Sequence, residues 1–295
     1  MENLYDIVVI GGGPAGISAG IYSYRAGMKV LVIDGGKSTL EKAVKIQNYY
    51  GIENISGAEL VQKGIDQYIN LGGEFLKEQV VNVARDFSTL NFVVKTTLKT
   101  IVSKAVILCV GGNSKKTLKE LEAYEGTNVS YCAICDGFFY RNATVAVVGE
   151  GDFAVHECKE LENIVNKVYL LTNGLSVDEG GLNKTTVINT KISGFGGKEK
   201  VDFVSFEDGT QLEVDGVFVA LGTLSGFNIS KQLGLLMNKD CLVVDKNFMT
   251  NVAGVFAAGD VVGGLLQVAK AVGDGAQAGL EAARYIKIKE YKENN

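Results

Sequence analysis

The feature that most constrains the fold is a strand–turn–helix–strand pattern near the N-terminus. The β-branched run Asp6–Ile10 predicts a buried parallel strand and leads directly into the glycine-rich turn Gly11–Gly16. A helix is expected over residues 17–26, and a second strand over residues 29–33 ends at Asp34. A glycine turn in this context, followed by an acid, is the fingerprint of a dinucleotide-binding unit. The sequence therefore predicts a parallel α/β nucleotide-binding domain.

The turn explains how such a unit would hold a dinucleotide. Its residues are Gly11, Gly12, Gly13, Pro14, Ala15 and Gly16. Gly11 permits a tight turn, Gly13 allows the backbone to approach the pyrophosphate, and Gly16 allows close helix–strand packing. The N–H groups and dipole at the start of the helix favour phosphate. Asp34 is expected to accept hydrogen bonds from a ribose.

A second unit of the same kind occurs near the middle of the chain. The apolar run Thr144–Val148 is followed by the turn Gly149–Ala154, a helix to about residue 166 and the strand Lys167–Leu171. This duplication predicts an α/β fold with two Rossmann-like, three-layer nucleotide-binding domains. We expect the first domain to be discontinuous, over residues 1–114 and 245–295, and the second to span residues 115–244. Strand-like segments at 73–82, 90–96 and 104–110 predict a small antiparallel insertion in the first domain.

The chemistry of the second unit is unusual for a nucleotide site. Its turn carries Glu150 and Asp152, and like charges about 6 Å apart at an effective dielectric of about 20 cost roughly 3 kcal/mol. The next strand ends in Leu171–Gly174, without the acid or arginine that usually selects NAD or NADP. The sequence has no arginine from residue 143 to residue 244. The degenerate second site is our interpretation; a site that uses only backbone and lysine is the alternative.

Between the two turns lies a Cys-x-x-Cys pair, Cys132 and Cys135, with Asp136 directly after it. Such a pair is either a redox disulfide or half of a metal site. A zinc site needs further ligands, but the chain has one histidine, His156, and its other cysteines are widely spaced. The redox interpretation is therefore favoured and no metal is expected. Asp136 is a candidate acid/base, or else a turn residue before Gly137.

The bulk composition excludes several function classes. The net charge of −5, with no basic block, argues against a nucleic-acid partner. No apolar run reaches the roughly 18 residues of a membrane span, and the first residues lack the pattern of a secretory signal. Five cysteines without a regular framework suit a reducing compartment, so a cytoplasmic location is expected.

Three separated motifs carry a resemblance that covers nearly the whole chain. They are Gly11–Gly16, Cys132–Gly137 and Gly254–Asp260. With these motifs the sequence resembles the low-molecular-weight thioredoxin reductases. The resemblance implies a homodimeric oxidoreductase that binds FAD in its first domain. The residues implied at the FAD, besides the glycine turn, are Asp34, Gln47, Asn48, Gly259, Asp260, Gln267 and Val268.

The resemblance also implies how the redox pair works. Cys135 is expected to be the sulfur nearer the flavin, where electrons enter. Cys132, once freed as a thiolate, is expected to attack the disulfide of thioredoxin. Asp136 is expected to exchange the proton of the leaving thiol.

The sequence departs from the family pattern where NADPH would bind. The family has a neutral glycine turn and a His-Arg-Arg run, whereas this chain has an acidic turn and Leu171–Gly174; Leu266 also replaces an arginine before Gln267. These departures are similar to the ferredoxin-dependent flavin thioredoxin reductases, so reduced ferredoxin is the expected donor. The lysines suggested for docking it are Lys37, Lys42, Lys45, Lys115, Lys116 and Lys119. An NADPH-dependent reductase with a divergent site, or a non-catalytic flavin-binding regulatory protein, are the alternatives.

Overall fold

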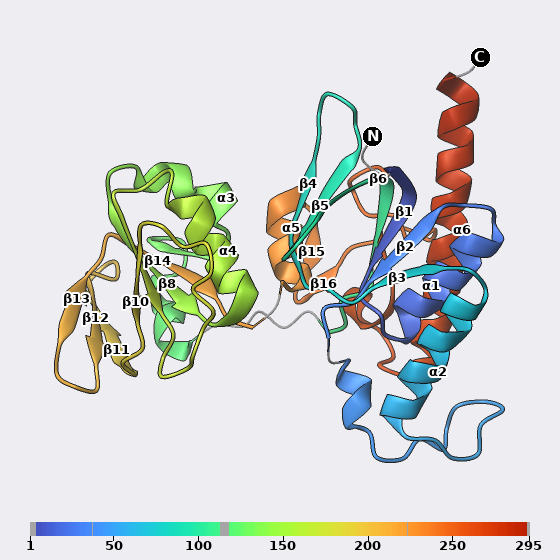
Figure 1. Cartoon of the computed structure of the whole chain (residues 1–295), viewed down its shortest axis with the longest axis horizontal. Coiled ribbons are helices and arrows are strands. Elements are labelled where there is room, and N and C mark those ends of the chain that lie inside the picture. The colour runs from blue at the N-terminus through green and yellow to red at the C-terminus, as the bar shows by residue number, and fades with distance from the viewer. Residues whose placement is uncertain (1–3, 37, 113–117, 223, 294–295) are drawn as a thin grey trace. The chain divides into compact units, whose positions relative to one another are not determined.

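A computed structural model describes residues 4–36, 38–112, 118–222 and 224–293 (Figure 1). The chain divides into two compact units. Unit 1 combines residues 1–114 with residues 225–295, and unit 2 comprises residues 115–224. The expected boundary at residue 114 falls among residues 113–117, which lie outside the described part.

Unit 1 is built on a mainly parallel sheet. In the described residues the strand order is β3-β2-β1-β6-β5-β4, and β17 also pairs with β6. The strands are β1 (Leu4–Ile10), β2 (Val30–Ile33), β3 (Glu74–Leu76), β4 (Val80–Arg85), β5 (Phe92–Thr96), β6 (Thr100–Leu108) and β17 (Val255–Ala257). A separate hairpin consists of β15 (Met237–Asn238) and β16 (Cys241–Leu242). The central strands β1 and β2 are almost completely buried, as their β-branched sequences predict.

The helices of unit 1 include two that pack closely against each other. They are α1 (Pro14–Arg25), α2 (Gly57–Asn70), α5 (Gly226–Leu233) and α6 (Val268–Glu293), with short 3-10 helices η1 (Thr39–Lys42) and η4 (Gly259–Val262). Ser18 Oγ of α1 donates to the carbonyl of Val272 in α6 at 2.7 Å. A Cβ built on Gly275 would lie 2.0 Å from the carbonyl oxygen of Ala15, so α6 can approach α1 this closely only with glycine there. The last segment of the chain thus completes the core around the first.

The predicted antiparallel insertion needs one correction. Strand β5 pairs antiparallel with both β4 and β6, as expected. The segment 73–82, predicted as one strand, instead forms two: β3 pairs parallel with β2, and β4 pairs antiparallel with β5. The three residues between β3 and β4 separate the two pairings, which an apolar pattern does not reveal.

Two further differences concern the C-terminal part. Residues 225–244, which we assigned to the second domain, group with unit 1, because Gln232 of α5 accepts a hydrogen bond from Val83 N–H at 3.0 Å. The charged sequence of residues 288–295 predicts a frayed end, yet α6 continues to Glu293. Lys104 anchors this end, since its Nζ lies 2.6 Å from Glu290 Oε1 and 2.7 Å from Asp6 Oδ1.

Unit 2 repeats the strand–helix–strand pattern around a parallel sheet in the order β10-β9-β8-β14-β7. Its sheet strands are β7 (Val129–Ser130), β8 (Thr144–Gly149), β9 (Lys167–Leu171), β10 (Thr185–Ile188) and β14 (Gly216–Ala220). An antiparallel sheet is formed by β11 (Ile192–Gly196), β12 (Phe203–Phe206) and β13 (Gln211–Glu213). The helices are α3 (Ala133–Asp136), α4 (Gly151–Leu161), η2 (Lys119–Tyr124) and η3 (Gly137–Tyr140). The predicted two-domain α/β architecture is confirmed. None of the described helices is both long and apolar enough to span a membrane.

Candidate active site

The two cysteines of the Cys-x-x-Cys pair form a disulfide in unit 2. Cys132 caps the short helix α3, and the backbone N–H of Cys135 donates to Cys132 Sγ at 3.2 Å. Cys132 is 2% exposed, whereas Cys135 lies on the surface. One sulfur is therefore sheltered and the other accessible. No group of three or more potential metal ligands exists among the described residues, so the pair is not part of such a cluster there.

Asp136 is tied to the redox pair through a side chain that the sequence did not single out. Ser130 Oγ donates to Asp136 Oδ2 at 2.7 Å and accepts the backbone N–H of Cys132 at 3.2 Å. Ser130 is almost fully buried. The hydroxyl thus connects the candidate acid/base to the backbone of the first cysteine. The available sequence signal was only its position two residues before Cys132.

A second carboxylate, which sequence reasoning also missed, lies directly behind the pair. Glu157 of α4 accepts the backbone N–H of Ala133 at 2.6 Å through Oε2, and its side chain is 1% exposed. Burial raises the pKa of Glu157 to about 7, which the hydrogen bond from Ala133 opposes. An amphipathic reading of α4 expects charged residues on the solvent side, so a buried acid is not visible in the pattern.

The other titratable side chains that the sequence raised do not join this site. Burial raises the pKa of both Cys109 and Cys158, so neither thiol is activated as a nucleophile. His156 Nε2 lies 3.6 Å from Glu160 Oε1 on the same helix.

In unit 1 the glycine turn has the geometry that a dinucleotide requires. Gly11 has φ +109°, and a Cβ there would lie 2.2 Å from the carbonyl oxygen of Cys109. A Cβ on Gly16 would lie 1.7 Å from the carbonyl oxygen of Gly11. By contrast, the space around Gly13, which caps α1, is open apart from Ser38 Oγ at 3.5 Å. A side chain at Gly11 or Gly16 would therefore clash with the protein backbone, whereas the space beside Gly13 is free for a ligand.

Helix α1 presents its N-terminus without a competing anion. Gly13, the N-cap residue of α1, provides no side-chain cap hydrogen bond, and the first turn of α1 contains no acid. Asp34, at the end of β2, accepts the N–H of Gly12 at 3.0 Å, which holds the carboxylate beside the turn. Burial raises the pKa of Asp34, partly offset by hydrogen bonds from Gly12 and Gly36. The side chain therefore stands ready to exchange these bonds for ribose hydroxyls.

The remaining candidates meet at the start of α6. Asn48 Nδ2 donates to Gln267 Oε1 at 2.8 Å, which joins two positions that the resemblance implied. The N–H of Gly259 donates to Asp274 Oδ2 at 3.2 Å, and Asp260 follows in η4. Gln47 is exposed beside Asn48.

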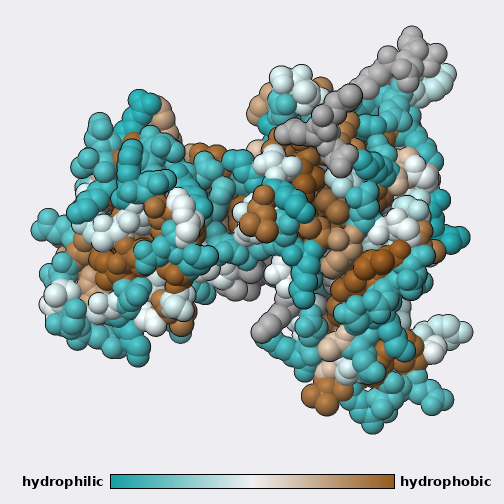
Figure 2. Space-filling model, in the orientation of Figure 1, coloured by the Kyte–Doolittle hydropathy of each residue, from teal (hydrophilic) through white to brown (hydrophobic). Residues whose placement is uncertain are grey.

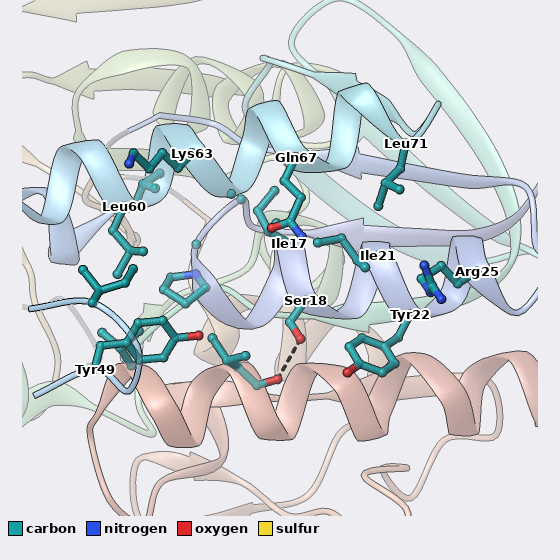
Figure 3. A pocket seen from close by; sticks show the side chains of 18 residues that line it. Ile17, Ser18, Ile21, Tyr22, Arg25, Tyr49, Leu60, Lys63, Gln67 and Leu71 are labelled. Carbon is teal, nitrogen blue, oxygen red and sulfur yellow. Dashed lines mark hydrogen bonds between the residues drawn. The ribbon is translucent and has the colours of Figure 1, made fainter. Parts of the chain in front are cut away.

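A cavity of about 720 Å³ extends from the glycine turn between α1, α2 and the start of α6. Figure 3 shows Ile17 and Ile21 of α1 facing the side chains of α2, with Tyr22 on the side of α1 toward α6 and Tyr49 near one end. Hydrophobic residues gather on the surface of unit 1 over α1 (Figure 2). Gly12, Gly13, Pro14 and Val268, all predicted cofactor residues, line this cavity. The residues of unit 1 thus fit an extended dinucleotide with an apolar part.

The corresponding turn in unit 2 does not have these properties. Glu150 takes the N-cap position of α4 without a side-chain cap bond, and Asp152 occupies the first turn. After β9, Asn173 uses its side-chain oxygen to accept the N–H of Ile192 at 2.9 Å. Farther along, Glu162 Oε1 accepts the backbone N–H groups of Asn183, Lys184 and Thr185. The N–H of Ile192, beyond the carboxyl ends of β9 and β10, is therefore occupied by the protein itself, whereas the Glu162 contacts lie at the opposite edge of the sheet, where β10 begins.

Comparison with known proteins identifies the family of this chain. The model of the pyridine nucleotide-disulphide oxidoreductase family matches residues 5–177 and 182–275. A thioredoxin reductase of Ureaplasma parvum is 33% identical over 307 residues, covering 97% of this chain and 98% of that protein. A thioredoxin reductase of Bacillus subtilis is 31% identical over 310 residues, covering 97% and 96% of the two chains.

Two solved structures are similar over the whole chain. The atypical thioredoxin reductase TRi from Desulfovibrio vulgaris Hildenborough has a TM-score of 0.89 and 36% identity, covering 96% of this chain and 98% of that one. A ferredoxin-flavin thioredoxin reductase from Clostridium acetobutylicum has a TM-score of 0.74 and 30% identity, covering 98% and 99%. With its redox disulfide and its dinucleotide turn, the chain belongs to the thioredoxin reductase family of FAD-binding pyridine nucleotide-disulphide oxidoreductases.

Proposed function

We propose that this protein reduces thioredoxin through FAD and the Cys132–Cys135 pair, and that reduced ferredoxin supplies the electrons. The observation that carries the choice of donor is the acidic turn of unit 2, where Glu150 and Asp152 stand at the start of α4. An NADPH pyrophosphate bound there would face two carboxylates in place of a neutral turn.

The FAD site that we propose is formed by unit 1, which combines residues 1–114 with residues 225–295. When bound, FAD supplies two-electron reducing equivalents to the disulfide. The residues proposed to hold it are Gly11, Gly12, Gly13, Pro14, Ala15, Gly16, Asp34, Gln47, Asn48, Gly259, Asp260, Gln267 and Val268.

The protein side of the reaction is a pair of thiol–disulfide exchanges. Two electrons and one proton convert the Cys132–Cys135 disulfide into a thiol at Cys135 and a thiolate at Cys132. The thiolate of Cys132 then attacks the thioredoxin disulfide and forms a mixed disulfide, and Cys135 displaces the reduced thioredoxin. Asp136, which Ser130 orients, exchanges the proton at Cys135 as its sulfur leaves or attacks.

Anaerobic mixing with each donor tests the proposal. Reduced ferredoxin should bleach the flavin rapidly and support thioredoxin reduction, whereas NADPH should leave the flavin oxidised. Rapid bleaching by NADPH would overturn the ferredoxin reading in favour of an NADPH-dependent enzyme with a divergent site. Cys132→Ser should retain flavin and lose thioredoxin reduction; retained activity would exclude the exchange mechanism, and no activity of the wild type with either donor would favour a non-catalytic flavoprotein.

A docking surface for the donor follows from the charge of ferredoxins, which are commonly acidic. Of the suggested lysines, Lys42, Lys45 and Lys119 are exposed, and Lys37, Lys115 and Lys116 lie outside the described residues. Exchange of Lys42 and Lys45 for Glu should weaken reduction by ferredoxin, more strongly at low salt, and should not affect reduction by dithionite.

We also propose that the chain acts as a homodimer in the cytoplasm. Helix α6 exposes the large apolar side chains of Leu280, Ile288 and Tyr291. A partner subunit that packs on α6 would bury these side chains. Light scattering of the purified flavoprotein tests this, and a monomer at micromolar concentration would contradict it.

A further inference from the structure

The contacts of Glu157, the buried acid behind the redox pair, do not explain why a carboxylate is needed for the fold. Within the described residues Glu157 accepts one hydrogen bond, from Ala133 N–H to Oε2 at 2.6 Å. Its other oxygen, Oε1, is buried and has no hydrogen-bond partner in the described structure. An ionised carboxylate in such surroundings is costly, because burial removes its hydration without supplying compensating donors. A structural role alone would be served as well by glutamine.

The single hydrogen bond connects Glu157 to the redox pair. Ala133 directly follows Cys132 and is the first residue of α3. The Glu157 carboxylate and the sulfur of Cys132 therefore accept hydrogen bonds from backbone N–H groups of the same short helix. Ala133 N–H donates to Glu157, and Cys135 N–H donates to Cys132 Sγ. A negative charge that appears on Cys132 must raise the energy of a negative charge on Glu157.

We propose that Glu157 is a positioning residue that stores a proton for the redox pair, binding it when the disulfide is reduced and releasing it when the disulfide re-forms. Reduction breaks the S–S bond and adds two electrons and two protons. One proton remains on the Cys135 thiol, and the second, which a Cys132 thiolate does not hold, is carried by Glu157. When Cys132 and Cys135 are oxidised by a substrate disulfide, the two electrons pass to that disulfide, and the protons of Glu157 and of the Cys135 thiol pass through solvent to the two substrate thiols. The inference rests on the proposed exchange role of the pair, and not on the identity of the electron donor.

Other titratable groups lie on α4 itself and on the elements around it. On α3 they are the two cysteines and Asp136; on α4 they are His156, Cys158 and Glu160. Strand β9 carries Lys167 and Tyr169, and η3 carries Tyr140, whereas β8 and β14 have no titratable side chains. Of these, Glu160 contributes to the raised pKa of Glu157, after burial. Any test must therefore separate Glu157 from Glu160.

The sign of the effect is fixed by charge. In the disulfide form burial raises the pKa of Glu157 to about 7. A thiolate at Cys132 raises the pKa further, so Glu157 is protonated in both forms below about pH 7 and differs between them above that pH. In this window reduction takes up one additional proton, and the tendency to be reduced falls more steeply as the pH rises.

The test is an equilibrium titration of the flavoprotein in glutathione redox buffers. Samples are quenched in acid, alkylated, and the peptide that carries Cys132 and Cys135 is quantified by mass spectrometry. For wild type, the equilibrium constant for reduction by glutathione should fall by up to about tenfold per pH unit above pH 7, beyond the change caused by the thiols themselves. Glu157→Gln should lose this additional fall. Equal pH profiles for wild type and Glu157→Gln would overturn the proposal.

Glu160→Gln is the matched control, because it removes one carboxylate three residues away on the same helix. It should keep the additional fall and shift it to lower pH, since Glu160 raises the pKa of Glu157. Loss of the effect in Glu160→Gln alone would contradict the assignment.

A second measurement does not depend on the variant folding. Reduced-minus-oxidised infrared spectra of wild type at about pH 7.5 should show a carboxylic-acid carbonyl band that appears on reduction, since the proton binds a buried carboxylate. The band should shift in D₂O. Its absence would refute proton storage even if thioredoxin reduction is normal, whereas a pair that glutathione cannot reduce would instead refute the proposed function.

Discussion

Ser130 Oγ and Asp136 Oδ2 are joined by a hydrogen bond of 2.7 Å across the first turn of the redox segment. The same hydroxyl accepts the backbone N–H of Cys132. Asp136 is therefore held in one orientation relative to the pair by a residue outside the Cys-x-x-Cys motif.

Ser130→Ala should lower the rate of thioredoxin reduction about tenfold, because it removes a charge-assisted hydrogen bond worth about 1.5–3 kcal/mol that fixes Asp136. Stopped-flow measurement of thioredoxin reduction at several pH values checks this. Ser130→Thr, which keeps the hydroxyl, is the control. A rate for Ser130→Ala equal to that of wild type would mean that Asp136 needs no such support.

Because α1 and α6 pack closely at Gly275 but not at Gly273, alanine at these two positions should change the stability of unit 1 in opposite directions. Gly275→Ala places a Cβ 2.0 Å from the carbonyl of Ala15 and should destabilise unit 1 and reduce its flavin content. We expect a loss of about 3 kcal/mol, the upper part of the range for overpacking. Urea unfolding and flavin absorbance measure both effects.

Gly273→Ala is the matched control in the same helix. Nothing lies within 4 Å of its Cβ position, so the substitution should stabilise α6 by about 0.5–1 kcal/mol. Similar destabilisation by both substitutions would show that the close approach at Gly275 is not the cause.

Glu162 should make the stability of unit 2 depend on acid. Burial raises its pKa, but hydrogen bonds from Lys184, Thr185 and Asn183 lower it by more, so the net pKa lies below the ordinary 4.5. A depressed pKa stabilises the fold above the unfolded-state value, and this contribution is lost as the pH falls through the folded-state pKa.

The corresponding variant is Glu162→Gln, which should unfold about 2 kcal/mol more easily at pH 7, because charged acceptors form the stronger hydrogen bonds. Thermal unfolding at pH 7 and in acid checks it, and the difference from wild type should shrink as the acid is protonated. A difference that is independent of pH would contradict the charge-based explanation.

The acidic turn of unit 2 predicts a gain of binding. Glu150→Gln with Asp152→Asn should bind NADPH roughly tenfold to a hundredfold more tightly than wild type, because removal of like charges near a bound pyrophosphate lowers its energy by about 1.5–3 kcal/mol. Calorimetry on the oxidised flavoprotein measures the affinity. The control, Glu199→Gln with Glu213→Gln, removes the same charge elsewhere in unit 2; equal gains would assign the effect to net charge alone.

The strand–turn–helix units were predictable because their signals are local. The positions of β1, β2, β8 and β9 follow from short β-branched runs next to glycine turns, whose conformational demands are met within a few residues. The Cys132–Cys135 disulfide was predictable for the same reason, since its two sulfurs are three residues apart.

What escaped prediction depends on contacts between distant segments. The two pairings within 73–82 are decided by neighbours on opposite sides, β2 and β5. Glu157 lies 24 residues from its partner Ala133, and a charged residue in an amphipathic helix gives no sign that it is buried. Likewise, the assignment of α5 to unit 1 rests on Gln232 reaching Val83.

Unit 1 is assembled from two stretches of the chain, and the whole of unit 2 lies between them in the sequence. Strand β17 completes the sheet beside β6, and α6 covers α1, so the first 114 residues lack part of their core until the last segment is available. During synthesis the contiguous unit 2 can therefore finish folding first, although it is made second. Premature termination between residue 224 and β17 would release a folded unit 2 attached to a sheet that lacks β17, a species suited to proteolysis or aggregation.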